Sequence, residues 1–272
     1  MATIELDMGQ VTFLAFIQGL TEFLPISSSA HLLLPTLLLD WSDQGLTFDV
    51  AVHVGTLIAV LVYFLPDIRA LFMAWCRSFG GRHDSHSRLA WYLILATFPA
   101  GISGLLLNDW IEEYARSALV IGITSIVFAL LLLVADLGSR RDRSLEQITW
   151  REAAFIGFAQ VLALIPGTSR SGITMTAALL CRLSRRDAAR FSFLLAIPII
   201  LASGLLRSID LLAAEGGSLQ WSQLLYAATL SAVVAYACIH YFLRLIERVG
   251  YLPFVIYRVL LGILLLGFFW LL

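Results

Sequence analysis

Apolar segments long enough to cross a membrane recur along the chain, and they restrict its fold more than any other feature. A membrane-spanning helix needs about 20 predominantly apolar residues. Six segments meet this requirement, two of them by including flanking residues: roughly 50–65, 89–107, 117–135, 191–206, 222–243 and 253–272. Because 60% of the 272 residues are apolar and only 14% are charged, little of the chain is left for a soluble domain. The sequence predicts an all-α polytopic membrane protein, a single membrane domain over residues 1–272.

Two further apolar stretches are interrupted. Residues 11–39 contain Pro25 and a run of three serines, and residues 153–182 contain Pro166-Gly167 followed by TSRSG. Each arm has about 10 to 14 residues, which at about 1.5 Å per residue is too short for a bilayer core of about 30 Å. Proline removes a backbone donor and disfavours a helical conformation in the residue before it. Both stretches are therefore predicted to be helix–break–helix hairpins with the break at membrane depth.

The distribution of charge between the segments predicts the topology. Loops 67–88, 140–151, 182–190 and 244–248 are rich in arginine, whereas the N-terminus and loops 40–49, 109–116 and 208–220 are mostly acidic. The positive-inside rule places the arginine-rich loops in the cytoplasm. Both ends of the first hairpin then lie outside and both ends of the second lie inside. We therefore expect two re-entrant hairpins that enter from opposite faces, with six transmembrane helices between and after them.

The two hairpins also indicate an internal repeat, of about residues 11–136 and 153–272. The sequence AFIQGLTEFLPISSS aligns with GFAQVLALIPGTSRS when one gap is allowed. This alignment pairs Gln18 with Gln160, Pro25 with Pro166, and Ser28 with Ser169. Since one half begins outside and the other inside, the repeat is predicted to be inverted. Inverted repeats usually meet near the bilayer midplane around a binding site.

The two breaks together favour an anion site. Irregular backbone at membrane depth is tolerated only where it is buried in protein or lines a watery cavity, so we expect the breaks to face each other. Helices that restart after residues 27–29 and 169–171 would direct free N–H groups at one point, which suits phosphate. Capping of these helices is the ordinary alternative role for the serines. The residues expected to bind phosphate are Ser27, Ser169, Arg170, Ser171 and Thr174.

The first hairpin supplies groups for catalysis. Gln18 and Glu22 are four residues apart on one helix face, where their oxygen atoms can hold Mg²⁺ or Ca²⁺ together with water and substrate phosphate. A purely structural ion pair with Arg170 is the alternative role for Glu22. Ser28 is a candidate nucleophile with His31 as its general base. Attack by His31 itself, or by a metal-bound water, stays open at this point.

Other residues carry weaker signals. Asp49 and His53 share one face at the start of the segment 50–65, where they either support the site or lie at the interface. The three cysteines are far apart and fit neither a metal spacing nor a disulfide framework. A net charge near −1, without a basic face, makes nucleic acid an unsuitable partner.

These motifs resemble those of the bacterial undecaprenyl pyrophosphate phosphatase family, also called bacitracin resistance proteins. The sequences QGLTEFLPISSSAH and PGTSRSGIT carry the resemblance, which extends through FDVAVHVGTL, FSFLLAIPI and FVIYRVLLG over essentially the whole chain. The family's (E/Q)xxxE motif falls on Gln18 and Glu22, its PGxSRSxxT motif on residues 166–174, and its histidine on His31. Glutamine in place of glutamate at the first position makes a weaker metal ligand. His53 stands where we would expect glutamine.

The resemblance implies an enzyme that removes one phosphate from undecaprenyl pyrophosphate at the outer face of the bacterial cytoplasmic membrane. This reaction regenerates the lipid carrier for peptidoglycan synthesis, lowers sensitivity to bacitracin, and needs a divalent cation. The expected partners are the polyprenyl pyrophosphate and membrane lipids, and the oligomeric state is open between a monomer and a homodimer. A transporter or flippase of a polyprenyl phosphate lipid is the alternative, since broken helices and inverted repeats suit carriers equally well.

Overall fold

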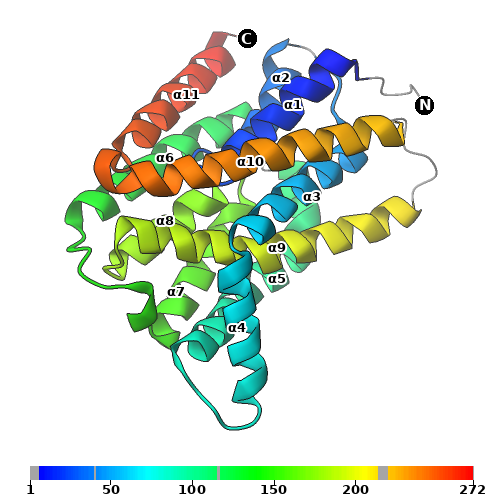
Figure 1. The fold of residues 1–272 in the computed structure, drawn as a ribbon. Coiled ribbons are helices and arrows are strands. Elements are labelled where there is room, and N and C mark those ends of the chain that lie inside the picture. Colours follow the sequence, from blue (N-terminus) through cyan, green and yellow to red (C-terminus); the bar gives the residue numbers. More distant parts are fainter. Residues whose placement is uncertain (1–5, 40, 115–116, 214–219, 272) are drawn as a thin grey trace.

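The computed structural model describes residues 6–39, 41–114, 117–213 and 220–271 (Figure 1). Within these ranges the secondary structure is helical, apart from one isolated bridge between Arg143 and Leu183. The helices are α1 (Met8–Thr21), α2 (Ser28–Leu39), α3 (Gly45–Tyr63), α4 (Leu65–Ser78), α5 (Ser85–Tyr114), α6 (Ala118–Gly138), α7 (Trp150–Val161), α8 (Arg170–Leu180), α9 (Arg185–Ala213), α10 (Trp221–Val249) and α11 (Leu252–Leu271). Two short 3₁₀ helices, Leu145–Gln147 and Leu162–Leu164, precede and follow α7.

Six of the described helices are long and apolar enough to cross a membrane, which confirms the predicted number of spans. They are Gly45–Tyr63, Ser85–Leu107, Ala118–Gly138, Arg185–Leu206, Trp221–Val249 and Leu252–Phe269. Three of them, α3, α5 and α9, begin four to six residues earlier than predicted, because each helix includes a first turn with polar residues that the apolar run alone excludes. The predicted loop 67–88 is wrong in part, since α4 occupies the whole of its first half. α4 is an amphipathic helix whose Leu71 and Ala74 are buried, and the arginines in its sequence made it resemble a loop.

The two interrupted stretches form pairs of short helices, as predicted. The breaks span residues 22–27, between α1 and α2, and residues 162–169, between α7 and α8, and they contain Pro25 and Pro166. None of these four helices exceeds 14 residues, so none can span a bilayer alone. The predicted restart positions were too late, because the helices resume at Ser28 and Arg170.

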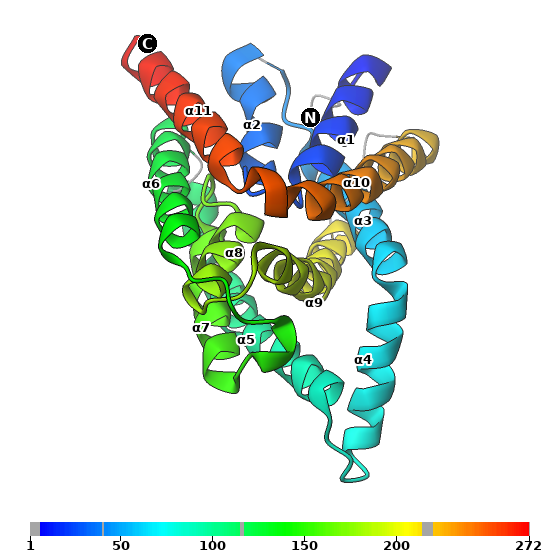
Figure 2. The same cartoon turned by 60° about the vertical axis from the view of Figure 1, so that its left-hand side comes forward.

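Three of the four short helices pack on different long ones. α1 lies along α10, α7 lies along α5, and α8 is enclosed by α6, α7 and α9 (Figure 2). Residues 171–179 of α8 are all buried, which is unusual for a segment that carries serine and threonine. Small residues permit close helix contacts in such bundles. At the crossing of α7 with α5, for example, Gly157 packs directly against the backbone of Ala96.

A tighter contact of this kind yields a stability prediction. A Cβ atom on Gly55 in α3 would collide with the carbonyl oxygen of Ala228 in α10. We expect Gly55→Ala to separate the two helices at a cost of about 1–3 kcal/mol and to lower the thermal unfolding midpoint in detergent, measured by circular dichroism. Gly101→Ala is the matched control, because a Cβ there meets no atom within 4 Å. Equal midpoints for the two variants would contradict the packing described.

The arginine-rich segments meet at one end of the bundle. Arg185, at the start of α9, binds Asp136, near the end of α6, with 2.6 and 2.8 Å contacts, and Asp136 also accepts a hydrogen bond from the backbone N–H of Tyr251. Arg190 binds Asp67 of α4 at 2.7 Å. These contacts join segments that are distant in the sequence, and they hold the predicted cytoplasmic loops together at one end of the bundle. The acidic loops 109–116 and 208–220 lie mostly outside the residues whose side chains are described.

Candidate active site

An ion pair joins the two helix breaks. Glu22 immediately follows α1, and Arg170 is the first residue of α8. Arg170 Nη2 donates to Glu22 Oε1 at 2.9 Å, and only 6% of the Glu22 side chain and 13% of the Arg170 side chain are exposed. Charges are rarely buried to this degree unless they are paired. The predicted convergence of the two breaks is therefore present, and its centre is this pair.

The second carboxylate oxygen of Glu22 accepts hydrogen bonds from two other polar side chains of the first hairpin. Ser28 Oγ donates to Glu22 Oε2 at 2.7 Å, and Gln18 Nε2 donates to the same oxygen at 3.0 Å. His53 Nε2 lies 3.9 Å from it. The structure thus brings together the predicted residues Gln18, Glu22, Ser28 and Arg170. It also places His53 beside them, in a position that favours the supporting role over the interfacial one.

His31 has partners other than the one we predicted. Its Nδ1 lies 2.7 Å from the carbonyl oxygen of Ser27, and its Nε2 lies 2.6 Å from the hydroxyl of Tyr257 in α11. A carbonyl only accepts, so in the neutral ring Nδ1 donates and Nε2 accepts from Tyr257. The expected Ser28–His31 pair is not formed in this structure, because the Ser28 hydroxyl is directed to Glu22 and both His31 nitrogens are occupied.

The two helix starts share a local geometry that differs from the predicted alignment. Ser27 and Ser169 both have a positive φ, of 72° and 69°, a conformation that costs energy in residues other than glycine. The hydroxyl of each lies close to that of the serine two residues on, at 3.3 Å for Ser27 and 3.2 Å for Ser169. Ser169 therefore corresponds to Ser27, and Ser28 corresponds to Arg170. These two side chains extend from the first turns of α2 and α8.

The remaining predicted phosphate-binding residues have contacts that support Arg170 or join the breaks. Ser171 Oγ donates to the carbonyl of Leu24 in the first break at 2.7 Å. Thr174 Oγ1 donates to the Arg170 carbonyl at 2.8 Å and lies 2.7 Å from Ser192 Oγ. Arg170 Nη1 donates to the Ser192 carbonyl at 3.3 Å. Ser192 was absent from the sequence-based site, because nothing in its local sequence distinguishes it.

A second arginine, which was not among the predicted site residues, contacts both breaks from α11. Arg258 is completely buried. It donates to Gly167 O at 2.7 Å, to Thr168 O at 2.9 Å and to Pro25 O at 3.4 Å. Its position in the apolar segment 253–272 could have identified it, since an ionisable residue inside such a segment is a functional candidate. With Arg170 it gives the convergence point two guanidinium groups against one carboxylate, a balance that favours an anion.

Removing this arginine is expected to damage both the fold and the site. Arg258→Met keeps much of the side-chain length but leaves three buried carbonyl groups without their donor, each at about 1–3 kcal/mol. We expect a lower thermal unfolding midpoint and at least about a tenfold loss in kcat/KM, since the breaks lose their common support. Both are measured on purified protein in detergent. Arg248→Met, at the C-terminal end of α10, is the control. A variant with wild-type kinetics and stability would show that Arg258 does not hold the breaks.

The donor set for a metal ion is limited. Among the residues that the structure describes, no group of three or more histidine, cysteine, aspartate or glutamate side chains could hold a metal. Glu22 supplies one carboxylate, and Gln18 Oε1 is buried without a hydrogen-bond partner in the protein. Such an atom calls for a donor or a cation. One carboxylate and one amide fit Mg²⁺ or Ca²⁺ only where water and substrate phosphate provide the other ligands.

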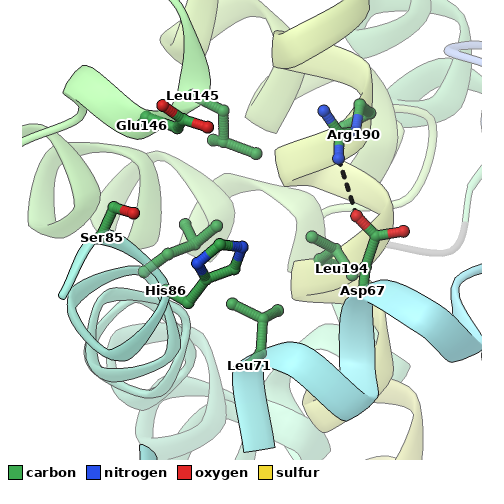
Figure 3. Close-up of a pocket in the computed structure, with 9 residues that line it drawn as sticks. Asp67, Leu71, Ser85, His86, Leu145, Glu146, Arg190 and Leu194 are labelled. Atoms are coloured by element: carbon green, nitrogen blue, oxygen red, sulfur yellow. Dashed lines mark hydrogen bonds and ion pairs between the residues drawn. The ribbon is translucent and has the colours of Figure 1, made fainter. Parts of the chain in front are cut away.

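A separate pocket lies at the arginine-rich end, between α4, α5 and α9 (Figure 3). Asp67 and Arg190 are paired on one side of it, Ser85 and Glu146 lie on the other, and His86 and leucines line the space between them. None of its lining residues belongs to the predicted site. Its arginine is already paired with carboxylates, so the pocket provides no free cationic group for a phosphate.

Comparisons with known proteins agree on one family. Residues 11–264 match the family described as bacitracin resistance protein BacA. An undecaprenyl-diphosphatase of Alteromonas mediterranea is 56% identical over 260 residues, which cover 95% of this chain and 97% of the relative. One of Hahella chejuensis is 58% identical over 254 residues, covering 93% and 95%. Undecaprenyl-diphosphatase 1 of Pseudoalteromonas translucida is 55% identical over 261 residues, covering 95% and 97%.

Proposed function

This chain belongs to the family of bacitracin resistance proteins BacA, and we propose that it hydrolyses undecaprenyl diphosphate where Glu22 meets Arg170. The chain is an undecaprenyl-diphosphatase that converts the diphosphate to undecaprenyl phosphate and inorganic phosphate. The reaction restores the lipid carrier for peptidoglycan synthesis and removes the diphosphate form that bacitracin traps. The observation that carries the assignment to this site is the buried 2.9 Å ion pair between the two breaks.

Binding of the diphosphate follows from the groups that converge there. Arg170 presents planar guanidinium donors that match phosphate oxygens. The first turns of α2 and α8 add backbone N–H groups and the positive ends of two helix dipoles. Arg258 contributes a further positive charge from within the protein. These groups are fixed before the substrate binds, so they stabilise the charge that develops on phosphate in the transition state without reorganisation.

Ser28 is positioned to act as the nucleophile, with Glu22 in place of His31 as its base. The Ser28 hydroxyl already donates to Glu22 Oε2 at 2.7 Å, within the range expected of a general base. In this step Ser28 Oγ bonds to the terminal phosphorus, its proton passes to Glu22, and the bond to the bridging oxygen breaks, which releases undecaprenyl phosphate. Glu22 passes this proton to the departing undecaprenyl phosphate and is a carboxylate again. Water then attacks the phosphorus of the phosphoserine and gives a proton to Glu22. The bond between Ser28 Oγ and phosphorus breaks, and Glu22 returns the proton to Ser28 Oγ as inorganic phosphate leaves. His31, held by Ser27 and Tyr257, positions the start of α2.

The resemblance implies a divalent cation, and Gln18 and Glu22 are the residues that would hold it. Bound there, Mg²⁺ or Ca²⁺ would neutralise part of the diphosphate charge. Gln18 Oε1, which lacks a protein partner, is the atom best suited to this role. The same amide donates to Glu22 through Nε2, so Gln18 also orients the carboxylate.

We place the chain in the bacterial cytoplasmic membrane with both hairpins re-entrant and residues 11–136 and 153–272 as inverted repeats. Three parallels support this arrangement: both breaks follow a short helix, both contain a proline, and both end in a serine with positive φ. The gathering of arginine-rich segments at one end supports a cytoplasmic position for that end. On this topology the site opens toward the outer face.

Phosphate release in the absence of any gradient tests the function. Purified protein in detergent is expected to release inorganic phosphate from undecaprenyl diphosphate in the presence of Mg²⁺ or Ca²⁺. A carrier would need two compartments and would leave its substrate intact. Protein that releases no phosphate in detergent, yet moves the lipid between leaflets of a vesicle, would replace the hydrolase with the flippase alternative.

A further inference from the structure

An apolar groove runs between α3 and α9 beside the site. α3 contributes His53, Val54 and Leu57, and α9 contributes Leu201, Gly204 and Leu205. Val54, Leu201 and Leu205 are 41%, 50% and 61% exposed, so the groove is open on its outer side. Both helices are among the six that can span the membrane. The open side therefore faces the lipid bilayer, where an apolar ligand can enter laterally.

The groove and the candidate active site share one residue. His53 lines the groove and also places Nε2 3.9 Å from Glu22 Oε2. The other residues named are aliphatic or glycine. Polarity is thus confined to the end next to Glu22, where a charged headgroup would be held. This polarity gradient matches a ligand with a diphosphate at one end and a hydrocarbon chain at the other.

We propose that this groove binds the first isoprene units of the polyprenyl chain while the diphosphate occupies the Glu22–Arg170 site. The inference rests on the proposed function and adds to it a binding site for the tail. An acyl chain of the bulk membrane also fits an aliphatic groove, but it lacks a headgroup held by Arg170. A tail attached to a bound diphosphate is present at a high effective concentration and therefore outcompetes free chains.

Gly204 provides a direct way to fill the groove. A Cβ atom built on it meets no other atom within 4 Å, so a side chain can start there without a clash, and Gly204 itself lines the groove. Gly204→Trp should occupy the position of the tail. Val54→Trp, from the opposite wall, blocks the same space by an independent route. Gly101→Trp in α5 is the matched control, since its Cβ also meets open space and Gly101 does not line the groove.

The test compares two substrates in the same detergent: undecaprenyl diphosphate and a prenyl diphosphate with a single isoprene unit. For each protein we take the ratio of kcat/KM for the long substrate to kcat/KM for the short one. Both groove variants are expected to lower this ratio about tenfold relative to wild type, the loss expected when about two buried methylene groups are displaced. Gly101→Trp is expected to leave the ratio unchanged.

Two results separate this inference from the proposed function. An unchanged ratio in folded Gly204→Trp and Val54→Trp, with wild-type protein active on both substrates, would overturn the groove and leave the hydrolase intact. Wild-type protein inactive on both substrates would overturn the function, and with it the groove, which depends on that function. Retained thermal unfolding midpoints establish that the variants are folded.

Discussion

Replacing Arg170 with methionine is expected to lower kcat/KM for undecaprenyl diphosphate hydrolysis by about a thousandfold. Loss of one preorganised donor to a developing oxyanion costs about a hundredfold to a thousandfold, and Arg170 supplies more than one. The substitution also leaves Glu22, with 6% of its side chain exposed, without its positive partner. The measurement is phosphate release by the purified variant over a range of substrate concentrations, so that kcat and KM are separated.

A surface arginine serves as the matched control for this variant. Arg190 pairs with Asp67 at 2.7 Å, but about a third of each side chain is exposed, and exposed pairs contribute about 0–1 kcal/mol. Arg190→Met should therefore stay within about threefold of wild type. Arg170→Lys keeps the charge but loses the planar guanidinium group. We expect its kcat/KM to lie between those of Arg170→Met and Arg190→Met. Near-normal turnover by Arg170→Met would show that phosphate is not bound at this arginine.

The second large effect is expected for Glu22→Gln, which should lose about a hundredfold to a thousandfold in kcat. Glutamine matches glutamate in shape but accepts no proton from Ser28, and it leaves Arg170 buried without a counter-charge. The steady-state rate of phosphate release is measured together with the thermal unfolding midpoint. Glu152→Gln, which removes the partner of Arg143 outside the site, controls for the loss of an ion pair as such.

The double variant distinguishes a shared role from two separate ones. Residues that act as a unit have non-additive effects, so Glu22→Gln combined with Arg170→Met should lose much less than the product of the two single losses. Strict additivity would mean that the ion pair has no part in a common step. It would favour the view that Glu22 and Arg170 act on the substrate independently.

The long spans and the two breaks were predictable from the sequence because each depends on local properties. An apolar run of sufficient length forms a helix in a membrane wherever its neighbours lie, and proline interrupts a helix through its own ring. The residues Gln18, Glu22, Ser28 and Arg170 followed from the same reasoning, since polar groups at membrane depth are costly and need partners. α4 was missed because its arginines resemble those of a solvated loop.

The contacts of individual side chains were not predictable, because they depend on packing between distant segments. Tyr257 and Arg258 reach the site from α11, 226 residues after His31 and 233 after Pro25. The partner of the Ser28 hydroxyl was expected to be His31, since the two are close in sequence, whereas the hydroxyl donates to Glu22. The structural correspondence of Ser169 with Ser27, in place of Ser28, was also not predictable. An alignment with a gap can place that gap on either side of a serine.

The position of a bound diphosphate tests the central claim most directly. A crystal structure with a methylene-bridged, non-hydrolysable analogue of undecaprenyl diphosphate would locate both phosphorus atoms. We predict that they lie against Arg170 and the first turns of α2 and α8, with the terminal phosphorus nearest to Ser28 Oγ. Phosphates bound instead in the pocket lined by Asp67 and Arg190, or anywhere remote from Arg170, would contradict the account.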